Sequence, residues 1–168
     1  LPENDAHKLY PFGEKMVRII GESMGYFHLQ ATKPDTIGAA LSDSPAGLAA
    51  YILEKFSAWS WQDQGLGQRD GRLTKAFTLD ELITNLMIYW TTGSITSSMR
   101  YYRENIYNMN ANRAWESQLV EIPVGATGAP AELMVCPQTF YELNHKNILQ
   151  YSDVQGGGHF FAFQEPVL

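Results

Sequence analysis

The sequence predicts an α/β fold in which a mostly helical region precedes the last strands of a sheet. Up to about residue 110, apolar residues recur at helical spacing and helix-start signals are frequent. Beyond that point the order is strand, loop with an acid, short helix, strand, and loop with a histidine. This order is typical of the end of an α/β sheet. Because two strands alone do not make a stable sheet, we expect further strands outside this chain.

The first helices follow from apolar spacing and from start signals. Residues 4–24 are expected to form one helix with a single apolar stripe, and residues 33–36 indicate a turn or a helix start. Ser44 as N-cap and Pro45 at the first helical position begin a helix that runs to about Trp59. We expect its buried side to carry Leu48, Ile52, Phe56 and Trp59.

Residues 60–75, rich in Gly, Gln, Asp and Arg, predict an exposed, mobile loop. Thr78 and Glu81 then have the spacing of a capping box at the start of another helix. Residues 91–94 should loosen or break that helix before a second helical segment with Tyr101 and Tyr102. Because adjacent residues point to different sides of a helix, one tyrosine can pack while the other faces a cavity.

Beyond residue 112 the expected elements are shorter. Residues 119–124 form a β-type run, 125–130 a loop, 137–145 a short helix and 148–154 a second strand. Glu132 lies just beyond the first strand and its loop, and His159 follows the second strand. Both side chains should therefore reach the same edge of the sheet, where ligands bind in such folds.

Three glycines, at positions 156–158, immediately precede His159. They allow a tight turn with positive φ and a close backbone approach. A histidine presented by such a turn can take and give protons near neutral pH. Taken alone, the stretch is better interpreted as a glycine turn with a partly buried histidine, and Glu132 as an ordinary surface carboxylate. Asp153 and Glu142 are competing acids, but Asp153 lies in the strand and Glu142 in the helix.

Composition excludes several classes of function. With a net charge of −6 and no basic run in 168 residues, a nucleic-acid groove or a polybasic membrane patch is not expected. The single cysteine, Cys136, excludes a disulfide framework and a thiolate zinc cluster. The four histidines show no metal-ligand spacing, so neither a metal nor another cofactor is expected. No apolar run reaches about 18 residues, and the polar start is not that of a signal peptide.

Several segments carry a resemblance to one enzyme family. The sequence closely resembles the C-terminal part of microsomal-type epoxide hydrolases, including the insect juvenile hormone epoxide hydrolases. The block at 43–56 is the most specific, whereas Gly-Gly-His-Phe alone would be weak. The other matching segments are residues 25–30, 32–36, 89–93, 102–105 and 157–160.

This resemblance implies an α/β-hydrolase fold with residues 1–110 as helical cap and 111–168 as the end of the core. It also implies site residues. In such hydrolases the triad runs in the order nucleophile, acid, histidine. His159 then resembles the general base and Glu132 the acid that orients it. Tyr26 and Tyr102 resemble the two cap tyrosines that hydrogen-bond the epoxide oxygen, with Tyr101 the less suitable neighbour.

The implied reaction is hydrolysis of an apolar epoxide to a vicinal diol through an alkyl-enzyme ester. The resemblance finds no nucleophile-elbow segment in this chain, so the aspartate nucleophile should lie in the N-terminal half of the same enzyme. That half is expected as a separate chain or fragment that stays with this one, unless the chain was truncated. Alternatives are a non-catalytic ligand-binding protein on the same scaffold, or an esterase if the nucleophile is serine. Detoxification or hormone metabolism would fit. A homo-oligomer is left open, as is an intracellular location in the cytoplasm or at the endoplasmic reticulum membrane through a segment absent here.

Overall fold

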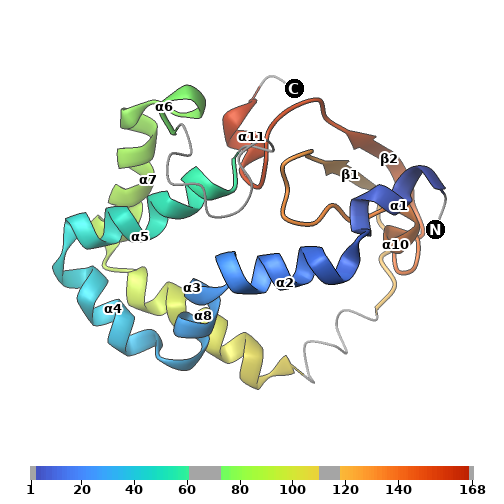
Figure 1. The fold of residues 1–168 in the computed structure, drawn as a ribbon. Helices are drawn as coiled ribbons and strands as arrows, with labels where there is room; N and C mark the ends of the chain where they lie inside the picture. Colours follow the sequence, from blue (N-terminus) through green and yellow to red (C-terminus); the bar gives the residue numbers. More distant parts are fainter. Residues whose placement is uncertain (1–2, 61–72, 110–117, 167–168) are drawn as a thin grey trace.

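The structure is a computed structural model that describes residues 3–60, 73–109 and 118–166. These residues form a helical part and a small parallel sheet, with α2 running between them (Figure 1). The predicted boundary near residue 110 and most of the predicted loop at 60–75 lie outside the described residues. The helical part contains α3 (Gly25–Thr32), α4 (Pro34–Asp43), α5 (Pro45–Ala58), α6 (Leu73–Ala76), α7 (Leu79–Thr92) and α8 (Ile95–Tyr107). The other elements are α1 (Glu3–Leu9), α2 (Phe12–Ser23), β1 (Val124–Gly128), α10 (Gln138–Tyr141), β2 (Ile148–Asp153) and α11 (Phe161–Gln164).

The single helix predicted for residues 4–24 is wrong, because the chain forms two helices there. α1 ends at Leu9 and α2 begins at Phe12, with Pro11 between them. Proline has no N–H to donate and restricts the residue before it, which ends a helix ahead of it. Of the predicted apolar stripe, Ile19 is buried in α2 but Ile20 is exposed.

The two helix starts predicted from capping residues are confirmed. Ser44 Oγ accepts a hydrogen bond from Gly47 N at 3.0 Å, and Pro45 is the first residue of α5. Thr78 and Glu81 form a complete capping box at the start of α7. α7 ends at Gly93, whose φ of 61° is the left-handed conformation that glycine adopts without strain. Residues 33–36 are indeed a helix start, since α4 begins at Pro34.

The core of the helical part lies where α4, α5 and α8 meet. α4 and α8 approach closely, since a Cβ at Gly38 would lie 2.5 Å from Thr96 Oγ1. Arg103 on α8 also donates to the Thr32 carbonyl at the end of α3, at 3.1 Å. These contacts hold α8 beside α3, so the tyrosines on those two helices can meet. The buried residues of this cluster are Leu41, Leu48, Ile95 and Met99.

The two described strands, β1 and β2, pair in parallel, with Ala126 opposite Tyr151 and Gly128 opposite Asp153. The second strand is confirmed, but the first is displaced toward the C-terminus from the predicted 119–124. Pro123 cannot donate to a ladder, and Val120 forms only an isolated bridge with His145. The predicted loop at 125–130 is mostly strand instead. Its glycines serve packing rather than turning, because a Cβ at Gly128 would lie 2.7 Å from Asp153 Oδ1. The predicted helix at 137–145 is shorter, at 138–141.

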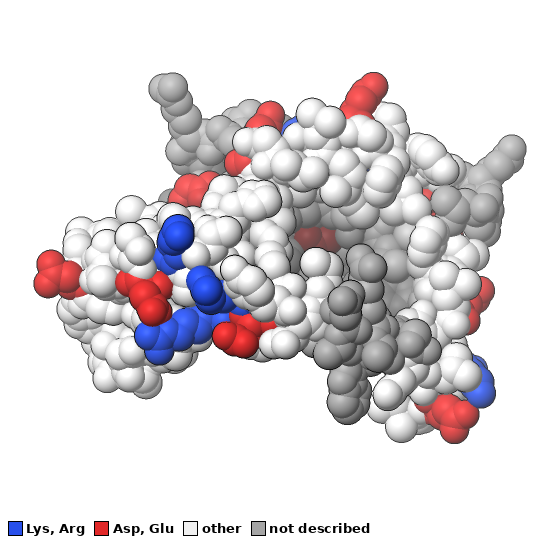
Figure 2. Space-filling view, turned by 90° about the horizontal axis from the view of Figure 1, so that it is seen from below, with Lys and Arg blue, Asp and Glu red and all other residues white. Residues whose placement is uncertain are grey.

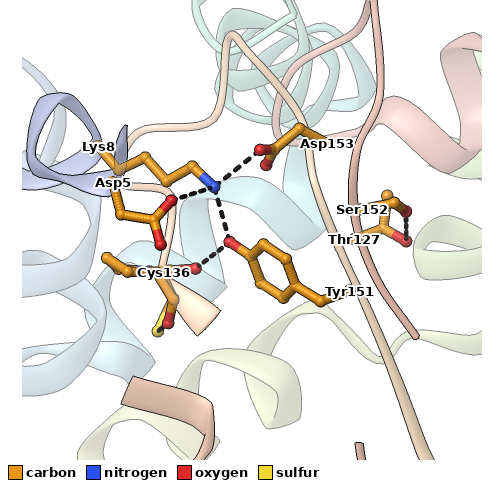
Figure 3. A network of polar contacts seen from close by, with 8 residues as sticks. Asp5, Lys8, Thr127, Cys136, Tyr151, Ser152 and Asp153 are labelled. Atoms are coloured by element: carbon orange, nitrogen blue, oxygen red, sulfur yellow. Dashed lines mark hydrogen bonds and ion pairs between the residues drawn. The ribbon is translucent and has the colours of Figure 1, made fainter. Parts of the chain in front are cut away.

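A buried lysine fastens α1 to β2 (Figure 3). Lys8 Nζ donates to Tyr151 Oη at 2.9 Å and to Asp153 Oδ2 at 2.8 Å, and it pairs with Asp5 at 3.1 Å. Tyr151 Oη in turn donates to the Cys136 carbonyl at 2.8 Å. Burial opposes the charge on Lys8, but the hydrogen bonds to Asp153, Tyr151 and Asp5 outweigh it and raise its pKa. The C-terminal end of the sheet is therefore fixed to the first helix by a charged group.

Replacement of Lys8 by methionine is expected to lower the free energy of unfolding by about 1–3 kcal/mol, because Asp5 and Asp153 are left facing each other without the cation. Equilibrium urea unfolding measures this. The matched control is Lys146→Met, whose ion pair with Glu121 is exposed on both sides. That variant should stay within about 0.5 kcal/mol of the wild type. Equal effects of the two variants would contradict the role assigned to Lys8.

Candidate active site

The two loops that follow the strands bring Glu132 and His159 together. Beyond β1 and β2 the parallel pairing continues as a bridge between Ala131 and Gly158, supported by a hydrogen bond from Ala131 N to Gly157 O at 3.0 Å. The next residues in this register are Glu132 and His159. Gly157 has a φ of 84°, which a glycine adopts at little cost, so the turn before His159 depends on the glycine run.

His159 and Glu132 are joined through one ring nitrogen. His159 Nδ1 lies 2.9 Å from Glu132 Oε1 and 3.1 Å from Oε2. A carboxylate accepts only, so Nδ1 carries the proton and Nε2 keeps its lone pair in the neutral ring. Nε2 has no hydrogen-bond partner among the residues that the structure describes. Leu133 N donates to Glu132 Oε1 at 2.7 Å and fixes the carboxylate.

The pair shifts the pKa of each partner toward the charged form. The hydrogen bond to Glu132 raises the pKa of His159 against the opposing effect of burial. Burial would raise the pKa of Glu132, but the hydrogen bond and charge of His159 and the N–H of Leu133 lower it overall. His159 thus contributes stability at low pH that is lost as pH rises through its raised pKa. Glu132 contributes stability at high pH that is lost as pH falls through its lowered pKa, so the pair stabilises most between the two.

A row of aromatic rings connects His159 to the two predicted tyrosines. The His159 ring meets the Trp59 ring edge to face, with centroids 5.1 Å apart. Trp59 meets Tyr26 at 5.5 Å, and Tyr26 meets Tyr102 at 5.9 Å. Trp59 is 5% exposed, and its Nε1 donates to Ser23 Oγ at 3.3 Å, which holds the indole in place. Residues from α3, the C-terminal end of α5, α8 and the loop after β2 therefore converge.

The environment of Tyr26 keeps its phenol protonated. Burial, together with the neighbouring Tyr102 hydroxyl, raises the pKa of Tyr26 to about 12. A phenol of this kind is a hydrogen-bond donor over the whole physiological range. Tyr101 is 69% exposed, whereas Tyr102 is partly buried against Tyr26 and Phe27. The two adjacent tyrosines thus face different surroundings, as the sequence indicates.

The competing acids lie elsewhere. Asp153 pairs with Lys8, and Glu142 accepts a hydrogen bond from Gln138 at 3.0 Å. Neither carboxylate contacts His159 in the part of the chain that the structure describes. Trp59 is the participant that the sequence analysis missed. Its position at the end of an apolar helix face predicts burial, but nothing in the spacing indicates that its ring would separate a histidine from a tyrosine.

A cavity of about 460 Å³ also borders Glu132, between α1, α2 and the loop after β1. Lys15 and Arg18 line it, whereas His159, Tyr26 and Tyr102 do not. We therefore place the candidate site on the side of the aromatic row. Viewed from below, the molecule is hollowed near its middle, with an acidic side chain at the floor and mostly uncharged surroundings (Figure 2).

Two classes of feature are not found among the described residues. Those residues include no group of three or more His, Cys, Asp or Glu side chains able to hold a metal ion. None of the helices that the structure describes has the length and apolar character needed to cross a membrane.

The chain is similar over nearly its whole length to known epoxide hydrolases, although no protein-family model matches it. It is 47% identical to epoxide hydrolase 1 of Oryctolagus cuniculus, covering 99% of this chain and 36% of that protein. It is 44% identical to the juvenile hormone epoxide hydrolase of Bombyx mori, covering 96% of this chain and 34% of that protein. The chain thus spans about a third of the length of these relatives.

Solved structures give the same result. The crystal structure of juvenile hormone epoxide hydrolase from the silkworm Bombyx mori superposes with a TM-score of 0.88 at 42% identity, covering 99% of this chain and 39% of that chain. Epoxide hydrolase from Aspergillus niger superposes with a TM-score of 0.68 at 23% identity, covering 99% and 37%, which supports the fold alone. The predicted resemblance to epoxide hydrolases and the predicted fold class, part of an α/β-hydrolase, are confirmed.

Proposed function

We propose that this chain supplies the acid–base pair and the two oxyanion-stabilising tyrosines of an epoxide hydrolase. The observation that carries the proposal is the row from Glu132 through His159, Trp59 and Tyr26 to Tyr102. It places a proton-accepting imidazole and two phenol donors around one aromatic cluster. In this proposal residues 1–110 are the cap and 111–168 the end of the hydrolase core.

The first step opens the epoxide. A carboxylate oxygen attacks one epoxide carbon, the C–O bond breaks, and its electron pair passes to the oxygen. Tyr26 and Tyr102 donate hydrogen bonds to that oxygen as its negative charge develops, and one of them protonates it. Because the phenols are neutral before the reaction, they favour the transition state more than the ground state. The product of this step is an alkyl-enzyme ester.

The second step hydrolyses the ester. His159 Nε2 takes a proton from water, and the resulting hydroxide attacks the ester carbonyl. Glu132 stabilises the imidazolium through Nδ1 and keeps the ring in its orientation. Collapse of the tetrahedral intermediate releases a vicinal diol and restores the carboxylate. The imidazolium then returns its proton to the tyrosinate that the first step left behind, so protons and oxygen atoms balance over the cycle.

The nucleophile must come from sequence outside these 168 residues. Residues 21–25 match Gly-x-Ser-x-Gly, but Ser23 is a buried residue at the end of α2 that accepts a hydrogen bond from Trp59, and no strand precedes it among the residues that the structure describes. The partner of this chain is therefore the remaining part of a hydrolase, with aspartate at the elbow. Serine there would favour an esterase, and an inert residue a binding protein. The two phenol donors favour an epoxide, because esterases use backbone amides to stabilise their oxyanion.

The substrate is an epoxide on an apolar skeleton. The part of the site around the tyrosines is built from aromatic rings, and Lys55 Nζ lies over the faces of Tyr26 and Trp59, 5.1 and 5.2 Å from the ring centroids. The names of several relatives specify juvenile hormone. A comparison of bulky terpenoid epoxides with small polar ones tests the preference. Equal kcat/KM values for both groups would contradict it.

The 168-residue chain alone should not turn over any epoxide, whereas a protein that adds the remaining hydrolase region should produce diol continuously. Chromatography of the diol with the two preparations at equal concentration measures this. Replacement of the elbow aspartate by asparagine in the longer protein is the control and should abolish turnover. Sustained turnover by the isolated chain would refute the proposal that the nucleophile lies outside these 168 residues.

The pH dependence of ester hydrolysis should follow the deprotonation of the His159 imidazole. Because the base must be neutral, the rate is expected to rise as pH increases through the pKa of His159, which lies above its ordinary value of about 6.5. Replacement of Glu132 by glutamine removes the carboxylate that raises this pKa, so the rising limb should move to lower pH. Single-turnover rates measured across pH 5–9 test this. An unmoved limb in Glu132→Gln would contradict the coupling.

A further inference from the structure

The loop that carries His159 is attached to the C-terminal end of α5 as well as to the sheet. His159 N donates to the Trp59 carbonyl at 2.8 Å. Gln164 adds a second connection with both ends of its amide. Its Nε2 donates to the Ser60 carbonyl at 2.8 Å, and its Oε1 accepts from Gly158 N at 2.9 Å.

The His159 loop packs closely against the C-terminal end of α5. A Cβ at Gly158 would overlap the Trp59 carbonyl oxygen, so only glycine permits this approach. Phe160 stacks on Phe56 of α5, with centroids 4.0 Å apart and an interplanar angle of 1°. Ser60 is 1% exposed. Gly158 and Phe160, the two neighbours of His159, therefore both contact the C-terminal end of α5.

The same end of α5 also supports the tyrosines, since the Trp59 ring contacts Tyr26. The C-terminal end of α5 therefore sets the position of His159 relative to Tyr26. On the sheet side, the loop has the bridge between Ala131 and Gly158. Loss of the Gln164 amide would leave the bridge between Ala131 and Gly158 in place and would remove the hydrogen bond to the Ser60 carbonyl.

We propose that Gln164 is a positioning residue for the hydrolytic step: its amide spans Gly158 and Ser60 and holds the His159 loop against α5, so that the imidazole stays on Glu132. This inference rests on the proposed function. Gln164 acts through the loop and does not touch the reacting atoms. Its removal should therefore impair the step that uses His159 and spare the step that uses the tyrosines.

The test uses the longer protein with Gln164→Leu, which keeps the bulk of the side chain and removes both hydrogen bonds. Gln138→Leu is the matched control, because in the part of the chain that the structure describes the Gln138 amide pairs with the exposed Glu142 and not with the His159 loop. We expect ester hydrolysis, and with it kcat, to fall on the order of ten- to hundredfold in Gln164→Leu. Ester formation and kcat/KM should stay within about twofold of the wild type, because the tyrosines are untouched.

A second readout does not depend on turnover. Nuclear magnetic resonance titration of labelled histidine gives the pKa of His159 directly. In Gln164→Leu it should fall toward the ordinary value of about 6.5 as the imidazole loosens from Glu132, and it should not move in Gln138→Leu. Should Gln164→Leu fold poorly, Gln164→Asn, too short to span both partners, is expected to show the same pattern more weakly.

The outcomes separate this inference from the proposed function. A lowered His159 pKa in a protein that hydrolyses no epoxide would leave the positioning role standing and refute the proposed function. An unchanged pKa and unchanged ester hydrolysis in both Gln164 variants, in an active hydrolase, would overturn the inference alone. A loss of ester formation and hydrolysis by the same factor would also overturn it, since it would indicate general destabilisation.

Discussion

Replacement of His159 by glutamine should halt the reaction at the alkyl-enzyme ester. The first step needs only the carboxylate and the tyrosines, so one equivalent of epoxide should be consumed. Glutamine cannot take a proton from water, and ester hydrolysis is expected to slow by about 10²–10⁴-fold. Intact mass spectrometry of the longer protein after incubation with substrate should show a mass increase equal to that of one epoxide.

The control for this experiment is His7→Gln, since His7 lies on the exposed side of α1, outside the aromatic row. It should turn over at the wild-type rate and accumulate no adduct. Normal steady turnover by His159→Gln would contradict the role of His159 as the general base of ester hydrolysis. A complete loss of epoxide consumption would assign His159 to the first step instead.

Replacement of either Tyr26 or Tyr102 by phenylalanine should slow the formation of the ester. Phenylalanine keeps the edge-to-face ring contacts and removes one donor to the developing oxyanion. Loss of such a donor costs about 10²–10³-fold in rate. The rate constant of adduct formation, followed under single-turnover conditions, measures this.

Tyr101→Phe is the matched control for the tyrosine variants, because it removes the same hydroxyl from the adjacent, exposed side chain. Its rate of ester formation should equal that of the wild type. An effect as large as that of Tyr102→Phe would mean that the assignment within the pair is wrong. A tyrosine variant that slows ester hydrolysis and leaves formation unchanged would contradict the division of roles.

Local signals in the sequence predicted the helix starts well. Ser44 and Thr78 cap backbone N–H groups within a few residues, so the physical cause lies within a short window. The break at Pro11 has an equally local cause, which apolar spacing alone does not register. The position of β1 could not be read in this way. Its residues Gly125 and Gly128 have weak strand preference, and they form a strand because β2 lies alongside.

The meeting of Glu132 and His159 could be predicted from the sequence, whereas the contacts around that pair could not. Parallel strand ends meet at one edge, which brings Glu132 and His159 together by topology. The choice of Tyr26 and Tyr102 came from family resemblance, because nothing local distinguishes a buried tyrosine from a donor. The contacts of Trp59 and Gln164 join residues about a hundred positions apart. Such contacts depend on the packing of the whole chain, which periodicity and capping signals do not describe.

A single turnover in ¹⁸O-labelled water tests the covalent mechanism most directly. With the longer protein in excess over substrate, the oxygen added to the epoxide carbon should come from the enzyme carboxylate. The first diol released should therefore carry no label, while the carboxylate gains one ¹⁸O atom from the water that His159 activates. A labelled diol in the first turnover would mean direct attack by water and would contradict the account.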